Sequence, residues 1–233
     1  MRARAEGVSV AIPAAGSGER MGGRSKGLLL LGDDPLLLHA LRPLLAHSRV
    51  DEVVVALPAG DSDDPPAWLS ELAPRVRVVA GGATRMHSVY AALNALPLAR
   101  TIALVHDGAR PFVTGDMVNR CLSVAEAGEG AVVGWPLVDT VKRVDTEGYV
   151  VETPDRTRLW HAQTPQAFPG RTLLEAYGQA LREGWSATDD AGIFERAGGR
   201  VRMVEGAPWN IKVTHPQDLS LARAILAERK GQA

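Results

Sequence analysis

Short apolar runs alternate with stretches of helical periodicity along most of the chain. The apolar runs, which have the length and composition of buried strands, cover residues 8–12, 53–57, 76–80, 102–105, 131–137 and 201–204. The stretches with helical spacing cover residues 35–47, 84–96, 114–127, 171–183, 188–197 and 215–230. Because strands that alternate with helices need crossover connections, the pattern predicts an α/β fold. We expect a Rossmann-like, mainly parallel twisted sheet with helices on both faces.

Polar residues at the ends of these stretches predict where helices begin. Thr114, Thr188 and Thr214 each stand at an expected N-cap position, where a hydroxyl can accept a hydrogen bond from the first turn. Pro216 then falls in the first turn of the last helix, where proline is tolerated. Residues 61–66 are polar and contain proline, which predicts a loop.

The segment 139–158 interrupts the alternation of strands and helices. Two strand-like stretches flank a turn at residues 146–148, in which Gly148 suits a positive φ, so a β-hairpin is predicted. An isolated two-stranded hairpin is only marginally stable in water, and the crossover pattern leaves no place for it in the main sheet. We therefore expect one domain over residues 1–233, with 139–158 as an arm that packs on a partner subunit. An edge extension of the same sheet is the alternative.

Composition narrows the class of protein. An apolar fraction of 45% over 233 residues is enough for the core of one α/β domain. The net charge of −1 argues against a general nucleic-acid or membrane surface. The first residues are charged and the next apolar run is too short for a secretory signal, and the single Cys121 excludes an internal disulfide. Cys121 lies within a predicted helix, and we expect it to be buried as a small hydrophobic residue. The expectation is a cytoplasmic protein with no nucleic-acid or membrane partner.

Residues 13–21 and the nearby Lys26 form the most informative segment. Gly16 and Gly18 remove Cβ atoms directly after the first strand, so backbone N–H groups can point at an anion. Arg20 adds a planar fork of donors and Lys26 a compact charge. Only four of the 26 cationic residues are lysines, which favours a functional role for the lysine in this loop over a plain surface charge. The segment predicts a polyphosphate site; a strand-to-helix turn with surface cations is the alternative.

Polar or glycine-rich groups follow several other predicted strands. They include Gly81, Gly82, Arg85 and Ser88 after the third strand, His106, Asp107 and Arg110 after the fourth, Thr140 after the fifth, and Lys212 late in the chain. Because ligands bind at the carboxyl ends of the strands in open parallel sheets, a shared site is expected there. A carboxylate opposite a cationic loop is a common way to hold Mg²⁺ beside phosphates, so Asp107 is the predicted metal ligand. The alternatives are a plain turn at residues 81–82 and a capping role for Asp107.

Several other chemistries find little support in the sequence. The six histidines lack zinc-ligand spacing, and no Gly-x-Ser-x-Gly elbow is present. A phosphate monoester, with a second pKa of about 6, is already an ionised nucleophile near neutral pH. Such a substrate needs only charge neutralisation and in-line placement, which cations supply.

Eight motifs carry a family resemblance that runs nearly from end to end. They are PAAGSGERM, Lys26, GGATR with Ser88, VHDGARP, VDTVKR, DRTRLWHAQTPQ, TDDAG and NIKVT. With them the chain resembles the sugar-nucleotidyltransferase superfamily, and most closely the 2-C-methyl-D-erythritol 4-phosphate cytidylyltransferase family. Two departures fall in the first loop: Gly27 stands where glutamine is frequent, and the spacer between Arg20 and Lys26 is one residue shorter than in some members.

The resemblance implies transfer of CMP from CTP to 2-C-methyl-D-erythritol 4-phosphate, in a Mg²⁺-dependent homodimer that exchanges arms. The implied catalytic residues are Arg20, Lys26, Lys212 and, from the partner's arm, Arg156. Together with the strand-end analysis, it predicts substrate-binding roles for Ala14, Ala15, Gly16, Gly82, Arg85, Ser88, Asp107, Arg110, Thr140 and Thr188.

Three other functions stay open at this point. A cytidylyltransferase for a pentitol phosphate such as ribitol 5-phosphate would keep the same first loop. A purine-using sugar-1-phosphate transferase would need more room near residues 81–82. A non-catalytic nucleotide-binding protein is expected to have lost Arg20, Lys26 or Lys212, and all three are present.

Overall fold

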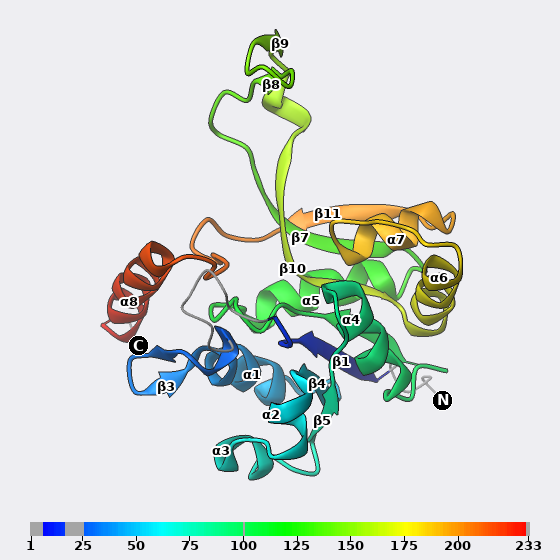
Figure 1. Ribbon diagram of the computed structural model, residues 1–233, viewed down its shortest axis with the longest axis vertical. Helices are drawn as coiled ribbons and strands as arrows, with labels where there is room; N and C mark the ends of the chain where they lie inside the picture. The colour runs from blue at the N-terminus through cyan, green and yellow to red at the C-terminus, as the bar shows by residue number, and fades with distance from the viewer. Residues whose placement is uncertain (1–6, 17–25, 100, 232–233) are drawn as a thin grey trace.

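A seven-stranded sheet forms the centre of the computed structural model, which describes residues 7–16, 26–99 and 101–231 (Figure 1). Its strands are β1 (Val8–Pro13), β4 (Val50–Leu57), β5 (Val76–Ala80), β6 (Ile102–Val105), β7 (Gly130–Pro136), β10 (Trp160–Pro169) and β11 (Val201–Glu205). The spatial order is β11-β7-β10-β6-β1-β4-β5, and every pairing is parallel except those that β10 makes with β6 and β7. The mainly parallel sheet and all six predicted strands are confirmed, whereas β10 was not predicted.

The six predicted helices are also present, with shifted ends. They are α1 (Leu36–Ala46), α4 (Arg85–Asn94), α5 (Gly115–Ala125), α6 (Gly170–Arg182), α7 (Asp190–Arg196) and α8 (Pro216–Lys230). Short elements not predicted are η2 (Lys26–Leu28), the hairpin of β2 (Leu30–Leu31) and β3 (Asp34–Pro35), α2 (Ala59–Asp63), α3 (Ala67–Ser70) and η3 (Arg156–Arg158). Helix α2 shows that describing all of residues 61–66 as a loop was wrong.

Helices cover both faces of the sheet, because successive strand residues point to opposite sides. In β1, Val10 and Ile12 belong to the apolar cluster that holds α1 and α5 side chains, whereas Ala11 belongs to the cluster with α4, α6 and α7. Cys121 of α5 is fully buried in the first cluster, as expected. Burial raises the pKa of the Cys121 thiol to about 12.

One of the three predicted N-caps is confirmed. Thr114 caps α5 by accepting a hydrogen bond from a first-turn N–H group. The predictions for Thr188 and Thr214 were wrong by one residue, since Asp189 caps α7 and His215 caps α8. In α7 the carboxylate of Asp189 takes the place expected for the hydroxyl.

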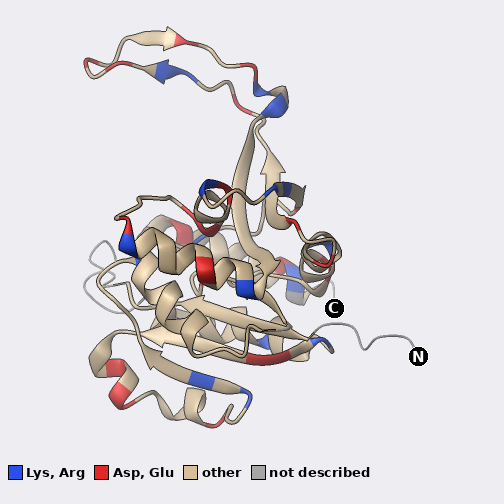
Figure 2. Cartoon of the chain, turned by 90° about the vertical axis from the view of Figure 1, so that its right-hand side faces the viewer, with Lys and Arg blue, Asp and Glu red and all other residues tan. Residues whose placement is uncertain are grey.

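The predicted hairpin is a separate two-stranded sheet of β8 (Arg143–Val144) and β9 (Val150–Glu152). It projects away from the body of the molecule at the end of a long arm, so it is no extension of the main sheet (Figures 1 and 2). Gly148 has φ +91°, as the turn requires. The arm leaves large apolar side chains in solvent, among them Tyr149 and Val150. Within the described part of the chain, no helix has both the length and the apolar character needed to cross a membrane.

Candidate active site

The topology of the sheet places a crevice next to β1. From β1 the chain passes to β4 and β5 on one side, and then returns to β6 on the other side. In open α/β sheets, ligands bind where the strand order reverses in this way, at the carboxyl ends of the strands. The segments that leave β1 at Ala14 and β6 at His106 are therefore the two walls of the expected site.

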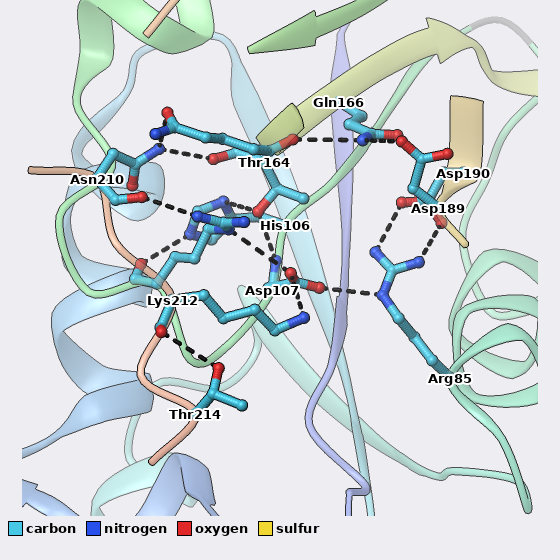
Figure 3. Close-up of polar contacts among 12 residues, drawn as sticks. Arg85, His106, Asp107, Thr164, Gln166, Asp189, Asp190, Asn210, Lys212 and Thr214 are labelled. Carbon is cyan, nitrogen blue, oxygen red and sulfur yellow. Dashed lines mark hydrogen bonds and ion pairs between the residues drawn. The ribbon is translucent and has the colours of Figure 1, made fainter. Parts of the chain in front are cut away.

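Asp107, directly after β6, is the centre of a charged cluster (Figure 3). Its carboxylate lies 2.8 Å from Lys212 Nζ, 3.1 Å from Arg85 Nε and 3.7 Å from Arg110 Nε. Burial acts against ionisation of Asp107, but the charges of these three residues outweigh it and hold the pKa of the carboxyl well below its usual range. The predicted site residues Arg85, Asp107, Arg110 and Lys212 are thus brought together, although they come from three distant parts of the sequence.

Arg85 is anchored from behind by a buried carboxylate. Its two terminal nitrogens lie 2.9 and 2.7 Å from the oxygens of Asp190, whose side chain is fully buried at the start of α7. Tyr177 of α6 also donates its hydroxyl to Asp190. Burial opposes the charged form of Arg85, yet the two aspartates raise its pKa above the usual value. Arg85 is therefore a fixed charge that links Asp190 to Asp107.

A buried hydrogen-bond chain holds the backbone on the other side of Asp107. Thr164 of β10 accepts a hydrogen bond of 3.0 Å from the N–H of Asp107, and its hydroxyl lies 3.0 Å from Nδ1 of His106. Burial lowers the pKa of His106 to about 4, so the ring is neutral, and its Nε2 donates to the carbonyl of Arg110. Neutral His106 thus ties β10 to the loop that carries Asp107 and Arg110.

Asn210 extends this chain to the segment that carries Lys212. Its Nδ2 donates to Oε1 of Gln163 and to the carbonyl of Thr164. The backbone carbonyl of Asn210 accepts a hydrogen bond of 2.8 Å from Arg110 Nη1. Buried polar networks of this kind rigidify a site where their members are satisfied. Among the described residues, Asn210 Oδ1 and Arg110 Nε are the two atoms of this network without a hydrogen-bond partner.

The other wall of the site is a close approach of two backbones. A Cβ on Gly81 would lie 2.3 Å from Cβ of Ala15, so only glycine lets the turn after β5 come this near the segment after β1. Ser88 of α4 fastens the turn, because its hydroxyl lies within hydrogen-bond distance of both the N–H and the carbonyl of Gly82. Four predicted residues, Ala14, Ala15, Gly82 and Ser88, therefore lie in this wall, and exposed Gly16 follows it.

Of the remaining predicted residues, those on the arm and the one before α7 are not part of either wall. Arg20 lies outside the described residues, and Lys26 is described only as the first residue of η2. Thr140 and Arg156 are exposed on the arm, which projects away from the site within one chain (Figure 1). Thr188 is exposed just before α7.

One departure of the first loop, Gly27, lies against α1. Gly27 is buried, and a Cβ there would lie 3.3 Å from Cβ of Leu37. Glycine at this position lets η2 pack closely on α1.

Several residues of the network were not predicted. They are Asp190, Tyr177, Thr164, Gln163 and Asn210. The motifs TDDAG, HAQTPQ and NIKVT contain four of them, so only a motif signal was available, and nothing in the sequence marks Tyr177 beyond its place in a helical pattern. Among the described residues, no group of three or more His, Cys, Asp or Glu side chains is placed to hold a metal ion.

Comparisons with known proteins agree with this geometry. The profile of the family described as 2-C-methyl-D-erythritol 4-phosphate cytidylyltransferase matches residues 8–228. Proteins of that description from Nostoc punctiforme and Symbiobacterium thermophilum are 43% and 44% identical, over 94% and 97% of this chain and 97% and 95% of their own lengths.

Solved structures give the same result. The 4-diphosphocytidyl-2C-methyl-D-erythritol synthase of Anaerococcus prevotii superposes with a TM-score of 0.85 at 30% identity, over 96% of this chain and 97% of that one. The 2-C-methyl-D-erythritol 4-phosphate cytidylyltransferase of Thermus thermophilus superposes with a TM-score of 0.78 at 35% identity, over 93% and 98%.

Proposed function

The chain belongs to the 2-C-methyl-D-erythritol 4-phosphate cytidylyltransferase family, and from this premise we propose how its residues divide the reaction between them. The enzyme transfers CMP from CTP to 2-C-methyl-D-erythritol 4-phosphate, below called the sugar phosphate, and releases pyrophosphate. This is a step in the synthesis of isoprenoid precursors. The observation that carries the proposal is the cluster of Arg85, Arg110 and Lys212 around one carboxylate, at the crevice beside β1. The proposed compartment is the cytoplasm, consistent with the use of CTP and with a chain that has one buried cysteine.

Lys212 and Arg110 are proposed to hold the attacking phosphate. The Lys212 side chain is 41% exposed, so its ammonium is accessible and can turn from Asp107 toward a phosphate oxygen. Arg110 Nε is buried 3.7 Å from Asp107 and makes no hydrogen bond among the described residues, so its N–H can be turned toward the same anion. The ionised phosphate oxygen attacks the α-phosphorus of CTP, and the bond to the pyrophosphate oxygen breaks. No proton has to be removed from the nucleophile.

The other wall is proposed to bind the nucleotide. Backbone groups of Ala14, Ala15, Gly16 and Gly82, with Ser88 beside them, can contact the cytosine and ribose, since the close approach at residue 81 leaves little room for side chains there. Arg20 and Lys26 are proposed to stabilise the charge that builds on the α-phosphate in the transition state. Thr188 is proposed to contact the sugar phosphate from the segment before α7.

Mg²⁺ is proposed as the metal, and the donor set suits a weakly protein-bound ion. Asp107 is an ionised hard oxygen ligand, but both of its oxygens already face cations, Oδ1 toward Arg85 and Oδ2 toward Lys212. It can thus supply one ligand at most, after Lys212 moves to the phosphate. Mg²⁺ commonly takes one or two carboxylates, with substrate phosphates and waters completing its coordination. The bound ion would neutralise charge on the triphosphate.

We propose a homodimer in which each arm completes the partner's site, with Arg156 and Thr140 binding the sugar phosphate. Two features support it: the hairpin strands β8 and β9 pair only with each other and not with the main sheet, and large apolar side chains of the arm are exposed. The test mixes Arg156→Ala with Lys26→Ala protein and allows subunit exchange. One site of the mixed dimer then carries both changes and the other neither, so activity should return to at most about a quarter of wild type for random pairing. Exchange without recovery would place Arg156 in the site of its own subunit.

The substrate assignment is tested by measuring pyrophosphate release with each of the four nucleoside triphosphates, against the sugar phosphate and ribitol 5-phosphate. We expect turnover with CTP and the sugar phosphate, at least about a hundredfold above every other pair in kcat/KM. Preference for ribitol 5-phosphate would support the pentitol alternative. Preference for a purine nucleotide would overturn the assignment of the residue 81–82 turn to cytosine.

A further inference from the structure

A third apolar cluster lies apart from the two that cover the sheet, under the C-terminal helix α8. We call it the α8 cluster; its members are the buried Leu31, Leu36, Phe112, Val213 and Ala222, and the partly buried Leu29, Trp209, Ile211, Leu219, Ile225 and Leu226. Figure 1 shows α8 beside the β2–β3 hairpin, at the side of the molecule and away from the sheet. Among the described residues, every α8 side chain that joins an apolar cluster joins this one.

Three of the segments that meet α8 in this cluster also carry a proposed substrate cation, and the fourth is the start of α1 at Leu36. Lys212 stands between Ile211 and Val213, both members of the cluster. Lys26 begins η2, three residues before the member Leu29, and Arg110 stands two residues before the member Phe112. Three cations from distant parts of the sequence are thus attached to one small apolar cluster.

Arg229, near the end of α8, joins the helix to two of these segments. Its guanidinium lies 4.4 Å from the ring centroid of Trp209 and 6.0 Å from that of Phe112. Its Nη1 also donates to the carbonyl of Phe112, at 3.5 Å. Trp209 precedes Asn210, whose carbonyl binds Arg110, so this contact lies next to the network of the active site.

The connection from Lys212 into α8 is short and fixed at both ends. Val213 donates its N–H to the carbonyl of Ala109, at 2.9 Å. The carboxylate of Asp218, in the first turn of α8, accepts from the N–H groups of Thr214 and His215, both at 2.7 Å. Only three residues separate Lys212 from the first residue of α8, so we infer that a displacement of α8 is transmitted to Lys212 through these hydrogen bonds.

We propose that α8 is a positioning element for the transfer reaction, and that Arg229 and Leu226 are positioning residues that act through Lys212 and the segment after Lys26. The inference rests on the proposed roles of these two lysines. A displacement of about 1 Å in a group that aligns the reactants can cost about a hundredfold in rate, so a contact remote from the substrates has a measurable effect. Helix α8 itself contacts neither substrate in this proposal.

The chain offers matched controls on the same helix. Leu226 lies in the cluster and Leu221 is 53% exposed, so both are changed to alanine. Arg229 and Arg223 are both exposed, but among the described residues only Arg229 of this pair lies over aromatic rings, so Arg223 is its control. We expect kcat/KM for the sugar phosphate to fall about tenfold in Leu226→Ala and about fivefold in Arg229→Ala, with partial recovery in Arg229→Lys, which keeps a cation over the rings. Leu221→Ala and Arg223→Ala should stay within about twofold of wild type.

A double-mutant cycle separates positioning from general loosening of the fold. If Arg229 acts in part through Lys212, adding Arg229→Ala to Lys212→Ala should lower kcat/KM by less than Arg229→Ala does in the wild-type background. If the double variant instead shows the product of the two factors by which the single substitutions lower kcat/KM, the inference is overturned. If Lys212→Ala alone has normal activity, the proposed role of Lys212 fails and the inference with it. If Lys212→Ala is impaired but Leu226→Ala and Arg229→Ala match their controls, only the inference is overturned.

Discussion

Replacing Asp190 by asparagine tests whether the buried ion pair behind Asp107 stabilises the protein. Asp190 is fully buried and accepts two hydrogen bonds from Arg85 and one from Tyr177. Asparagine keeps the shape of the side chain but removes its charge, and its amide group then faces the guanidinium. The substitution therefore leaves the largely buried Arg85 cation without the carboxylate that binds both of its terminal nitrogens.

The loss of folding stability expected for Asp190→Asn depends on how exposed Arg85 is. Removing one member of a buried pair typically costs about 3–5 kcal/mol. The Arg85 side chain is 29% exposed and keeps Asp107 as a second partner, so the lower end, about 3 kcal/mol, is expected. For a chain of this size, about 1 kcal/mol shifts Tm by about 2–4 °C, which gives a decrease of about 6–12 °C.

The assay is thermal unfolding at neutral pH, followed by circular dichroism. Asp34→Asn is the matched control, because Asp34 pairs with Arg42 on the surface and should change Tm by about 3 °C or less. The double variant Asp190→Asn/Arg85→Met should be more stable than Asp190→Asn alone, since it leaves no unpaired charge. Equal Tm values for Asp190→Asn and Asp34→Asn would refute the reasoning. So would a double variant whose decrease in Tm equals the sum of the decreases caused by Asp190→Asn and Arg85→Met alone.

Three further predictions concern charge and burial. Arg20→Ala or Lys26→Ala should lower kcat about a hundredfold or more while KM for CTP changes less, because these interactions strengthen only as charge builds in the transition state. Steady-state kinetics measures both constants, and a near-normal kcat would show that the loop only binds CTP. Lys212→Ala should raise KM for the sugar phosphate along with a loss of turnover, and a raised KM for CTP instead would contradict its assignment to the attacking phosphate. Burial raises the pKa of Cys121 to about 12, so the thiol should resist iodoacetamide at pH 8.5 in the native protein and react once the protein is denatured in guanidinium. Peptide mass mapping measures the labelling, and fast labelling of the native protein would mean that α5 opens readily.

The fold was largely predictable because most strands are continuous apolar runs between helical stretches. Strand β10 was missed for a local reason. Its buried middle contains Gln163, Thr164, Pro165 and Gln166, and its pairing with β7 shifts register between Ala162 and Gln166. These residues break both the apolar run and the period-2 alternation that identify strands. Their polar side chains are explained only by the partners that the fold brings to them.

The candidate site was predictable where residues follow a strand directly. Asp107 and Arg110 fall into this class, and Lys212 was found through its motif and the scarcity of lysine. The carboxylate that holds Arg85 was not predictable, because Asp190 is about 100 residues away in sequence and meets it only after α6 and α7 pack on the sheet. Arg85 itself was predicted to contact substrate, and that role stays a prediction. The contacts that the structure shows for Arg85 are its ion pairs with Asp107 and Asp190.

The late position of β10 in the sequence has a consequence for the chain while it is being synthesised. β6, which is entirely apolar and buried in the finished sheet, pairs with β1 on one side and with β10 on the other, where Val105 lies opposite Gln166. Val105 and Gln166 are roughly sixty residues apart in sequence, which at about 5–20 residues per second corresponds to about 3–12 s of translation. During that interval the half-sheet of β5, β4, β1 and β6 ends in an open hydrophobic edge, the kind of surface on which nascent chains associate. A ribosome paused between β7 and β10 would therefore display an aggregation-prone chain, which holdase chaperones that bind extended apolar segments are suited to shield.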